Sequence, residues 1–159
     1  MLLEAALALS FYTIPACRWL DTRIPGCVTG AGRMCAQGPM VNGEMRNYLI
    51  QASALCPMGD TSARPIPLGA KVLIVNVTAT EPTGTGNLLL FDATAPAPVV
   101  SSLNFQPGRT VANLGFVNLG QQMGLEPGTE IMPDLAIRAQ LPQGGSVHVV
   151  VDFVGYMAE

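Results

Sequence analysis

The chain has 159 residues and a formal net charge of −3, and only 12% of its residues are charged, against roughly 25% in a typical soluble protein. Because 49% of the residues are hydrophobic, intrinsic disorder is excluded, and the length suits one compact domain. Lys71 is the single lysine and the arginines are scattered, which disfavours nucleic-acid binding, and no apolar run approaches the ~20 residues of a membrane-spanning helix.

Residues 1–9 predict an apolar N-terminal arm in front of a single domain over residues 10–159. The arm is interrupted by Glu4 and has no basic residue before its apolar stretch, so it is a poor secretion signal. Its large apolar side chains are Met1, Leu2, Leu3, Leu7 and Leu9. Two alternatives stay open for them: contact with another subunit, or packing on the chain's own domain.

The first half of the domain predicts short strands between irregular segments. Ser10–Ile14 alternates like a strand that Pro15 ends, and Arg46–Gln51 is a second strand. Between them, Cys27–Asn42 is rich in glycine and lacks periodicity, which predicts a loop. Pro57–Gly69 contains too many prolines and glycines for a regular element.

A hairpin is predicted from Val72 to Phe91. Val72–Thr80 alternates apolar and polar residues, Glu81–Gly86 is typical of a turn, and Asn87–Phe91 is again strand-like. Two alternating segments joined by such a turn predict two paired antiparallel strands.

Four more strands and two turns complete the predicted fold. The turns are Pro107-Gly108 and Gly144-Gly145, and the strands are Val99–Phe105, Thr110–Leu119, Leu135–Leu141 and Val147–Val154. No segment between them has three turns of amphipathic helical pattern. The sequence therefore predicts an all-β, antiparallel two-sheet sandwich or jelly roll with eight to nine short strands and a disulfide-held N-terminal loop.

Four cysteines lie within the first 56 residues: Cys17, Cys27, Cys35 and Cys56. None forms a C-x-x-C pair, so zinc-finger and thioredoxin-like spacings are missing. An even count without metal spacing favours disulfides and an oxidising compartment. Three connectivities are possible; a nested arrangement, with the 17–56 bridge enclosing the 27–35 bridge, leaves no crossed loops and is preferred. Four buried free thiols are the alternative.

Four segments, taken in order, resemble a family of secreted bacterial β-domains. Phe11–Arg18 with Asp21-Thr22-Arg23 is similar to an FYTxxPCRxxDTR opening, and Asn76–Thr83 with Gly86-Asn87-Leu88 is similar to NVTxTxPTxxGxL. Ser101–Asn113 resembles SxLNxxPGxTxAN, and His148–Tyr156 resembles the closing HxxxDxxGYF, with Met157 in place of the final phenylalanine.

The resemblance implies an extracellular β module of the kind appended to or repeated in large surface proteins, with no established activity, ligand or catalytic residue. In the family, a cysteine before the central strand accompanies the cysteine of the opening motif. Cys17 and Cys56 match these places, which supports a bridge between them. Cys27, Cys35 and the loop that contains them are extra.

Catalytic chemistry has little support in the sequence. His148 is the single histidine, and four strand residues separate it from Asp152 by about 13 Å, too far for a direct relay. No nucleophile, zinc-protease or phosphate-loop motif occurs. Arg18, Asp21, Arg23 and Arg109 are expected to form structural charge pairs, because charges in such a chain must be paired where they are buried.

Metal and sugar sites are also weakly indicated. The carboxylates of Asp92, Asp134 and Asp152 do not fall into one loop, so no calcium site and no cofactor are predicted. Aromatic residues can stack on sugar rings or fill a core, and core packing is the expected use of at least half of four aromatic residues, namely Phe11, Tyr12, Trp19 and Tyr48.

These observations predict a non-enzymatic structural module, secreted to the cell surface, that associates with itself into an extracellular fibre or surface layer. The low charge removes the lysines that usually protect exposed strand edges, and the arm offers apolar surface to a neighbour. The alternative is a binding module for cell-surface carbohydrate, which predicts a monomer with exposed aromatic residues. Neither hypothesis involves nucleic acid or a membrane span.

Overall fold

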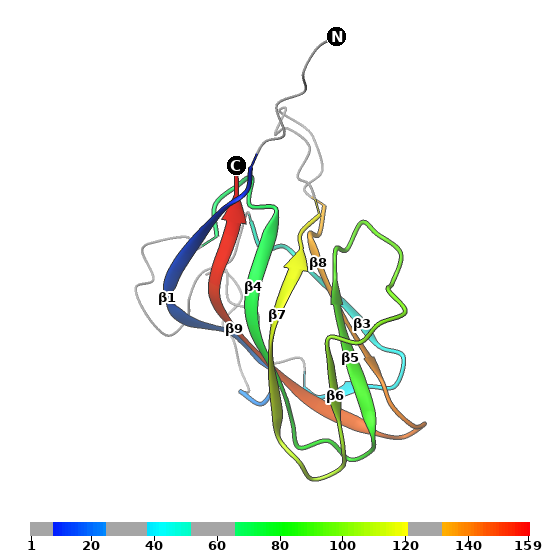
Figure 1. Cartoon of the computed structure of the whole chain (residues 1–159). Coiled ribbons are helices and arrows are strands. Elements are labelled where there is room, and N and C mark those ends of the chain that lie inside the picture. Colours follow the sequence, from blue (N-terminus) through cyan, green and yellow to red (C-terminus); the bar gives the residue numbers. More distant parts are fainter. Residues whose placement is uncertain (1–7, 25–37, 52–65, 121–131) are drawn as a thin grey trace.

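The structure is a computed structural model that describes residues 8–24, 38–51, 66–120 and 132–159. These residues form nine β-strands and no helix. The strands build two antiparallel sheets (Figure 1). The all-β, two-sheet architecture expected from the sequence is therefore confirmed.

The first sheet has five strands, four of which lie in the order β1-β9-β4-β7. Their bounds are β1 Ser10–Asp21, β9 Ser146–Ala158, β4 Val72–Thr80 and β7 Val111–Asn118. The fifth, β2 (Met40–Val41), pairs with the beginning of β9, next to the place where β1 ends. Within the described residues, β1 and β7 are thus the two long edges of this sheet.

The second sheet has four strands in the order β3-β8-β5-β6. Their bounds are β3 Met45–Tyr48, β8 Leu135–Gln140, β5 Gly86–Phe91 and β6 Leu103–Phe105. Because β6 is three residues long, it covers only the beginning of β5, from Gly86 to Leu88. The rest of β5 faces the segment from 92 to 102.

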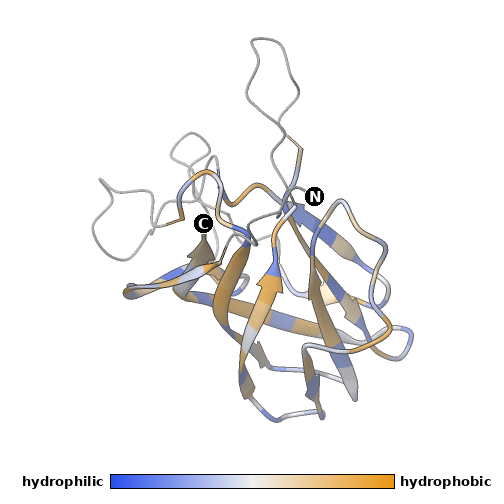
Figure 2. Cartoon of the chain, turned by 45° about the horizontal axis from the view of Figure 1, so that its top comes forward, coloured by the Kyte–Doolittle hydropathy of each residue, from blue (hydrophilic) through white to orange (hydrophobic). Residues whose placement is uncertain are grey.

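The core lies between the two sheets, and both contribute aliphatic side chains to it. Figure 2 shows that strands of both sheets carry hydrophobic residues. On the first sheet, alternate residues of β4 point inward, so that Leu73, Val75, Val77 and Ala79 are at most 1% exposed. β9 adds a matching row that ends at Phe153. This alternation is the period-2 pattern visible in the sequence.

The predicted hairpin between β4 and β5 is wrong. β4 pairs with β7 and β9, whereas β5 pairs with β6 and β8 in the other sheet. The connection leaves β4 through Glu81, which has a positive φ of 53°, and Pro82, whose carbonyl accepts a hydrogen bond from Gly108 N–H. The chain therefore turns across the core, because both strands bury apolar rows that cover each other best from opposite sheets.

The turns at Pro107-Gly108 and Gly144-Gly145 are present as predicted. Gly108 and Gly144 adopt positive φ angles of 72° and 81°, and hydrogen bonds close both turns. They also carry the chain from one sheet to the other, between β6 and β7 and between β8 and β9. Turn chemistry was thus readable from the sequence, but the pairing of the flanking strands was not.

Several strand bounds differ from the prediction. Pro15 does not end β1, which continues to Asp21 across a break in register between Thr13 and Cys17. An edge strand tolerates such a break because one side of it needs no partner. The predicted strand over 99–105 shrinks to β6, since Val99 and Val100 are 103% and 70% exposed. β3 begins one residue earlier than predicted and ends at Tyr48, and β9 extends to Ala158.

Candidate functional site

Three of the predicted charged residues meet on the outer face of the first sheet. Arg18 Nε donates to Asp152 Oδ1 at 2.9 Å, and Arg23 Nη2 donates to Asp21 Oδ2 at 2.7 Å. A third, longer contact of 3.8 Å joins Arg18 to Asp21. Arg109 is exposed in the turn before β7 and forms no ion pair with any described residue. Three of the four residues therefore pair, and the fourth stands apart.

These ion pairs keep the groups charged near neutral pH. The hydrogen bond from Arg23 lowers the pKa of the Asp21 carboxyl, although its burial opposes the shift. The hydrogen bond to Asp152 raises the pKa of Arg18. Asp21 is thus held ionised, which suits a structural anchor and does not suit a proton donor.

His148 lies next to this charged cluster, at the beginning of β9. Its Nδ1 is 2.9 Å from Thr22 Oγ1, and the same hydroxyl accepts a hydrogen bond from Val149 N–H at 2.9 Å. The histidine thereby fixes the chain where it leaves β1. A contact of this kind fits the structural role expected for His148.

Most of the cysteine and arm predictions lie outside the described residues. Cys17 is buried on β1 at 3% exposure, but Cys27, Cys35 and Cys56 are not described, so both disulfides and the disulfide-held loop stay predictions. Of the arm, Met1–Leu7 lies outside the described part. Leu9 is 40% exposed and leads directly into β1.

The four aromatic residues singled out in the sequence divide evenly. Trp19 and Tyr48 are 1% and 2% exposed and meet edge to face with ring centroids 5.1 Å apart in the core. Phe11 and Tyr12 are 58% and 41% exposed, and Tyr12 stacks on Tyr156 at 5.0 Å. At least half of the four therefore serve the core, as expected.

A row of apolar residues crosses the outer face of the first sheet. Gly155 of β9 lies opposite Ile74 of β4, which lies opposite Phe116 of β7. A Cβ built on Gly155 would meet Phe11 Cε2 at 3.2 Å, so the Phe11 ring lies beside this glycine. Ile74 is 2% exposed, but Phe116 is 66% exposed. The row ends in an exposed aromatic ring on the edge strand.

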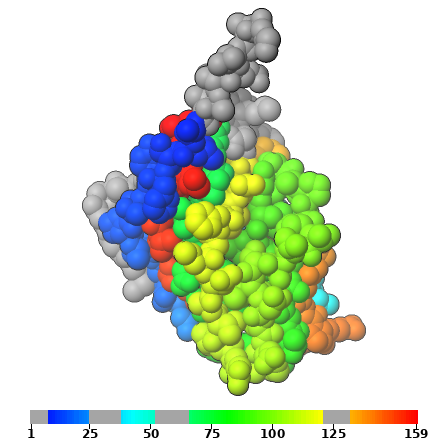
Figure 3. Space-filling view, viewed as in Figure 1, coloured from blue at the N-terminus to red at the C-terminus, as the bar shows by residue number. Residues whose placement is uncertain are grey.

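The edge strand β7 is the feature that sequence reasoning missed. Its eight residues, VANLGFVN, include no charge and no proline, and its register with β4 runs unbroken from Val72–Asn118 to Ala79–Val111. Leu114 on its outer face is 57% exposed. Among the described residues β7 pairs only with β4, and Figure 3 shows it on the surface beside the segment that follows β5. The sequence shows that this strand has no charged residue, but it does not show that the strand lies at an edge of the sheet.

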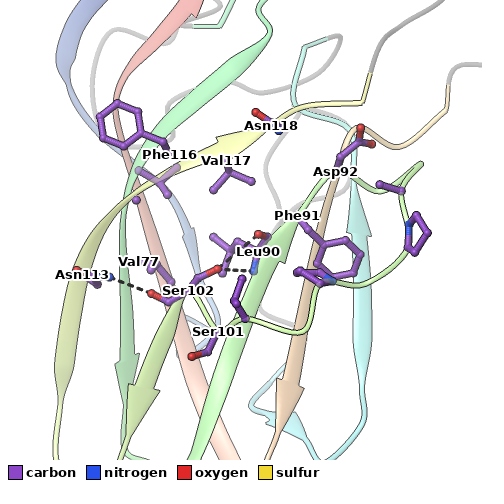
Figure 4. A pocket seen from close by; sticks show the side chains of 16 residues that line it. Val77, Leu90, Phe91, Asp92, Ser101, Ser102, Asn113, Phe116, Val117 and Asn118 are labelled. Carbon is purple, nitrogen blue, oxygen red and sulfur yellow. Dashed lines mark hydrogen bonds between the residues drawn. The ribbon is translucent and has the colours of Figure 1, made fainter.

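A groove of about 550 Å³ opens between β7 and the segment from 92 to 102 (Figure 4). Its floor consists of aliphatic core residues, namely Val75, Val77, Leu90 and Val117. Gly115 of β7 also lines it, and a Cβ built on that glycine would meet no atom within 4 Å. The position above Gly115 on the inner face of β7 is therefore open, although the four floor residues themselves are buried, at no more than 6% exposure.

Polar groups border the groove on the side of the second sheet. Ser102 Oγ accepts a hydrogen bond from Leu90 N–H at 2.8 Å, so a hydroxyl occupies the place of a strand partner there. Asn113 Nδ2 donates to the Ser102 carbonyl at 3.0 Å and joins the two walls of the groove at this point (Figure 4). This exposed bond is the one side-chain hydrogen bond that spans the groove within the described residues.

Two further observations concern sites of other kinds. In the described ranges, no three His, Cys, Asp or Glu side chains come close enough to hold a metal ion. The same part of the chain has no helix with the length and hydrophobicity to cross a membrane.

The comparisons with known proteins give no relative. No protein-family model, no curated protein and no solved structure matches the chain. The resemblance to secreted bacterial β-domains therefore rests on the four sequence segments alone, and function has to be argued from the geometry of the chain itself.

Proposed function

We propose that the chain is a secreted, non-enzymatic structural module that associates with itself into an extracellular fibre or surface layer. The observation that carries this proposal is the exposed edge of β7. Eight consecutive residues lack both charge and proline and keep one register, and their outer side chains include Leu114 and Phe116 at 57% and 66% exposure.

Such an edge favours addition of another strand. Natural sheets usually protect their edges with lysine, proline, bulges or shortness, because unpaired N–H and C=O groups recruit further strands. β7 has none of these features along its described length. An extended segment placed beside it gains backbone hydrogen bonds and covers apolar surface at the same time.

The proposal is tested by adding the missing protection. Lysine at Leu114 and Phe116 places two like charges on the edge of every subunit without entering the core, since both side chains point outward. The double variant L114K/F116K is expected to stay monomeric at concentrations where the unaltered chain forms large assemblies. Light scattering gives the size, and negative-stain microscopy gives the shape.

A matched control carries the same added charge elsewhere. Val41 on β2 and Met45 on β3 are exposed apolar residues, at 51% and 50%, on strands that do not pair with β7. The variant V41K/M45K is expected to assemble like the unaltered chain. Equal loss of assembly in both variants would show that net charge, and not the edge, governs association. A chain that stays monomeric at every concentration would overturn the proposal.

Binding of cell-surface carbohydrate is the second candidate, because Phe11 and Phe116 expose their rings on one sheet face. Near them, a shallow depression of about 390 Å³ is lined by Arg18, Asn76 and Asp152, whose polar atoms suit sugar hydroxyls. This function predicts that a monomer binds glycans on an array and that F11A abolishes the binding. Self-association predicts no dependence on glycans.

A further inference from the structure

We propose that the groove beside β7 receives residues 1–9 of a second copy of this chain as an added strand. The inference rests on the proposed self-association and adds which surfaces meet. The N-terminal arm of one copy is then the donor of the added strand, and the inner side of the β7 edge of the other copy is the acceptor.

An extended arm would place its single charge on one face and most of its large apolar side chains on the other. Its odd positions are Met1, Leu3, Ala5, Leu7 and Leu9, which include four of its five large apolar side chains. Its even positions are Leu2, Glu4, Ala6 and Ala8, so the charge of Glu4 is directed away from the odd-numbered face. Leu9 is 40% exposed, so the described end of the arm keeps apolar surface that a partner can cover.

The acceptor offers a row with the same period. The inner face of β7 carries Asn113, Gly115 and Val117, which lie opposite Val77, Val75 and Leu73. Asn113 is exposed and Gly115 half-buried, whereas Val117 is buried. Residues two apart on a strand are about 6.7 Å from each other, so the odd-numbered arm residues match this row in spacing. No atom lies within 4 Å of the position that a Cβ would take on Gly115, and this glycine lines a groove of about 550 Å³, which offers room for a larger apolar side chain.

The chain's own arm is poorly placed to fill its own groove. β1 and β7 are opposite edges of the sheet, separated by β9 and β4. The free side of β7 lies four strand spacings from β1, so reaching it covers about 19 Å and uses about six extended residues. About three of residues 1–9 would then remain to pair with β7, whereas an arm from a second copy can use them all.

Opposite placement also fixes the kind of assembly. A donor at one edge and an acceptor at the other edge form a head-to-tail contact, which repeats without closing on itself unless the rotation returns to the start. The geometry therefore favours a fibre over a layer.

The test compares chains of all 159 residues, each altered on one of the two proposed contact surfaces. L3S/L7S removes two apolar side chains from the odd-numbered face, and L2S/A6S makes the same number of changes on the even-numbered face. The first is expected to raise the concentration needed for half-maximal light scattering at least tenfold, and the second to leave it within twofold.

The acceptor is tested with Gly115→Leu, which fills the groove from the inside. This variant is expected to lose assembly while its melting temperature stays equal or rises, so that loss of folding is not the cause. A Gly115→Leu chain has an intact arm and a blocked groove, and an L3S/L7S chain has the reverse. Mixed at equal concentration, the two are expected to form a one-to-one dimer by light scattering, although each alone is monomeric.

The outcomes separate this inference from the function on which it rests. If L3S/L7S assembles like the unaltered chain while L114K/F116K does not, self-association stands and the arm is not the donor. If the mixture forms no dimer, exchange between copies is overturned. If the unaltered chain never assembles, the proposed function itself fails.

Discussion

The two long edges of the first sheet are built in opposite ways. β1 contains Pro15, changes register twice and carries Arg18 and Asp21. β7 is straight in register and has neither charge nor proline. β1 has the proline, register changes and charged side chains that discourage pairing with a further strand, and β7 lacks all three.

The difference shows that low overall charge is not spread evenly over this surface. The described ion pairs of the first sheet gather at β1 and the adjoining part of β9, where Arg18, Asp21 and Arg23 pair. At β7 the same sheet presents Leu114 and Phe116 instead. A chain with few charged residues thus places several of them at one edge of the sheet and none along β7 at the other edge.

The largest expected effect on stability is that of Gly155→Ala beside β1, and Gly115→Ala on β7 is its matched comparison. Gly155, next to β1, would place a Cβ 2.6 Å from Tyr12 O, whereas Gly115 on β7 has nothing within 4 Å. Gly155→Ala is expected to lower the free energy of unfolding by about 3 kcal/mol through overpacking. Gly115→Ala is expected to raise it by about 0.5–1 kcal/mol, because alanine restricts the unfolded chain. Urea denaturation measures both, and equal effects would mean that the two edges are equally tight.

The next effect concerns the buried carboxylate of β1. Asp21→Asn removes the charge that Arg23 binds at 2.7 Å, on a side chain that is 3% exposed. The free energy of unfolding is expected to fall by about 2 kcal/mol, as for a charged hydrogen bond. Thermal melting would show this at neutral pH. A Thr80→Val change, which removes the hydroxyl pair with Thr110 beside β7, is expected to cost about half as much.

Acid should weaken the β1 edge selectively. The pKa of Asp21 is lowered, chiefly by the hydrogen bond from Arg23. Its contribution to stability is therefore complete above the ordinary aspartate range and is lost as the pH falls through the lowered pKa. Hydrogen exchange is expected to accelerate in β1 before β7 as the pH drops. If Asp21→Asn shows the same acid loss as the unaltered chain, other carboxyl groups cause it.

The smallest expected effect comes from the half-exposed ion pair. The Arg18 side chain is 40% exposed and that of Asp152 is 19% exposed, so solvent screens much of their attraction. Arg18→Gln is expected to lower the free energy of unfolding by about 0.5 kcal/mol, and less in high salt.

His148→Gln is expected to lower the free energy of unfolding by about 1 kcal/mol or less, as for one hydrogen bond, and to leave assembly unchanged. Loss of assembly in the histidine variant would point to a role beyond structure.

Local pattern predicted much of the fold. The alternation in Val72–Thr80 gave a strand that the structure confirms at the same bounds, and the turns at Pro107-Gly108 and Gly144-Gly145 form where proline and glycine predicted them. The pairing of Arg23 with Asp21 was also expected, because charges two residues apart in an extended chain lie on one face. In these cases the determining interactions lie within a few residues of each other.

Tertiary structure decided which strands became neighbours. β4 and β5 look like a hairpin in the sequence, yet they pack face to face across the core, since pairing is set by where each apolar row finds cover. The same choice placed Val111–Asn118 at an edge and left Gly115 above an unfilled groove. Amino-acid sequence by itself determined that this stretch is an uncharged strand with alternating faces. Only the packing of two sheets, through contacts between residues far apart in the chain, made that strand an edge of the sheet that the described residues form.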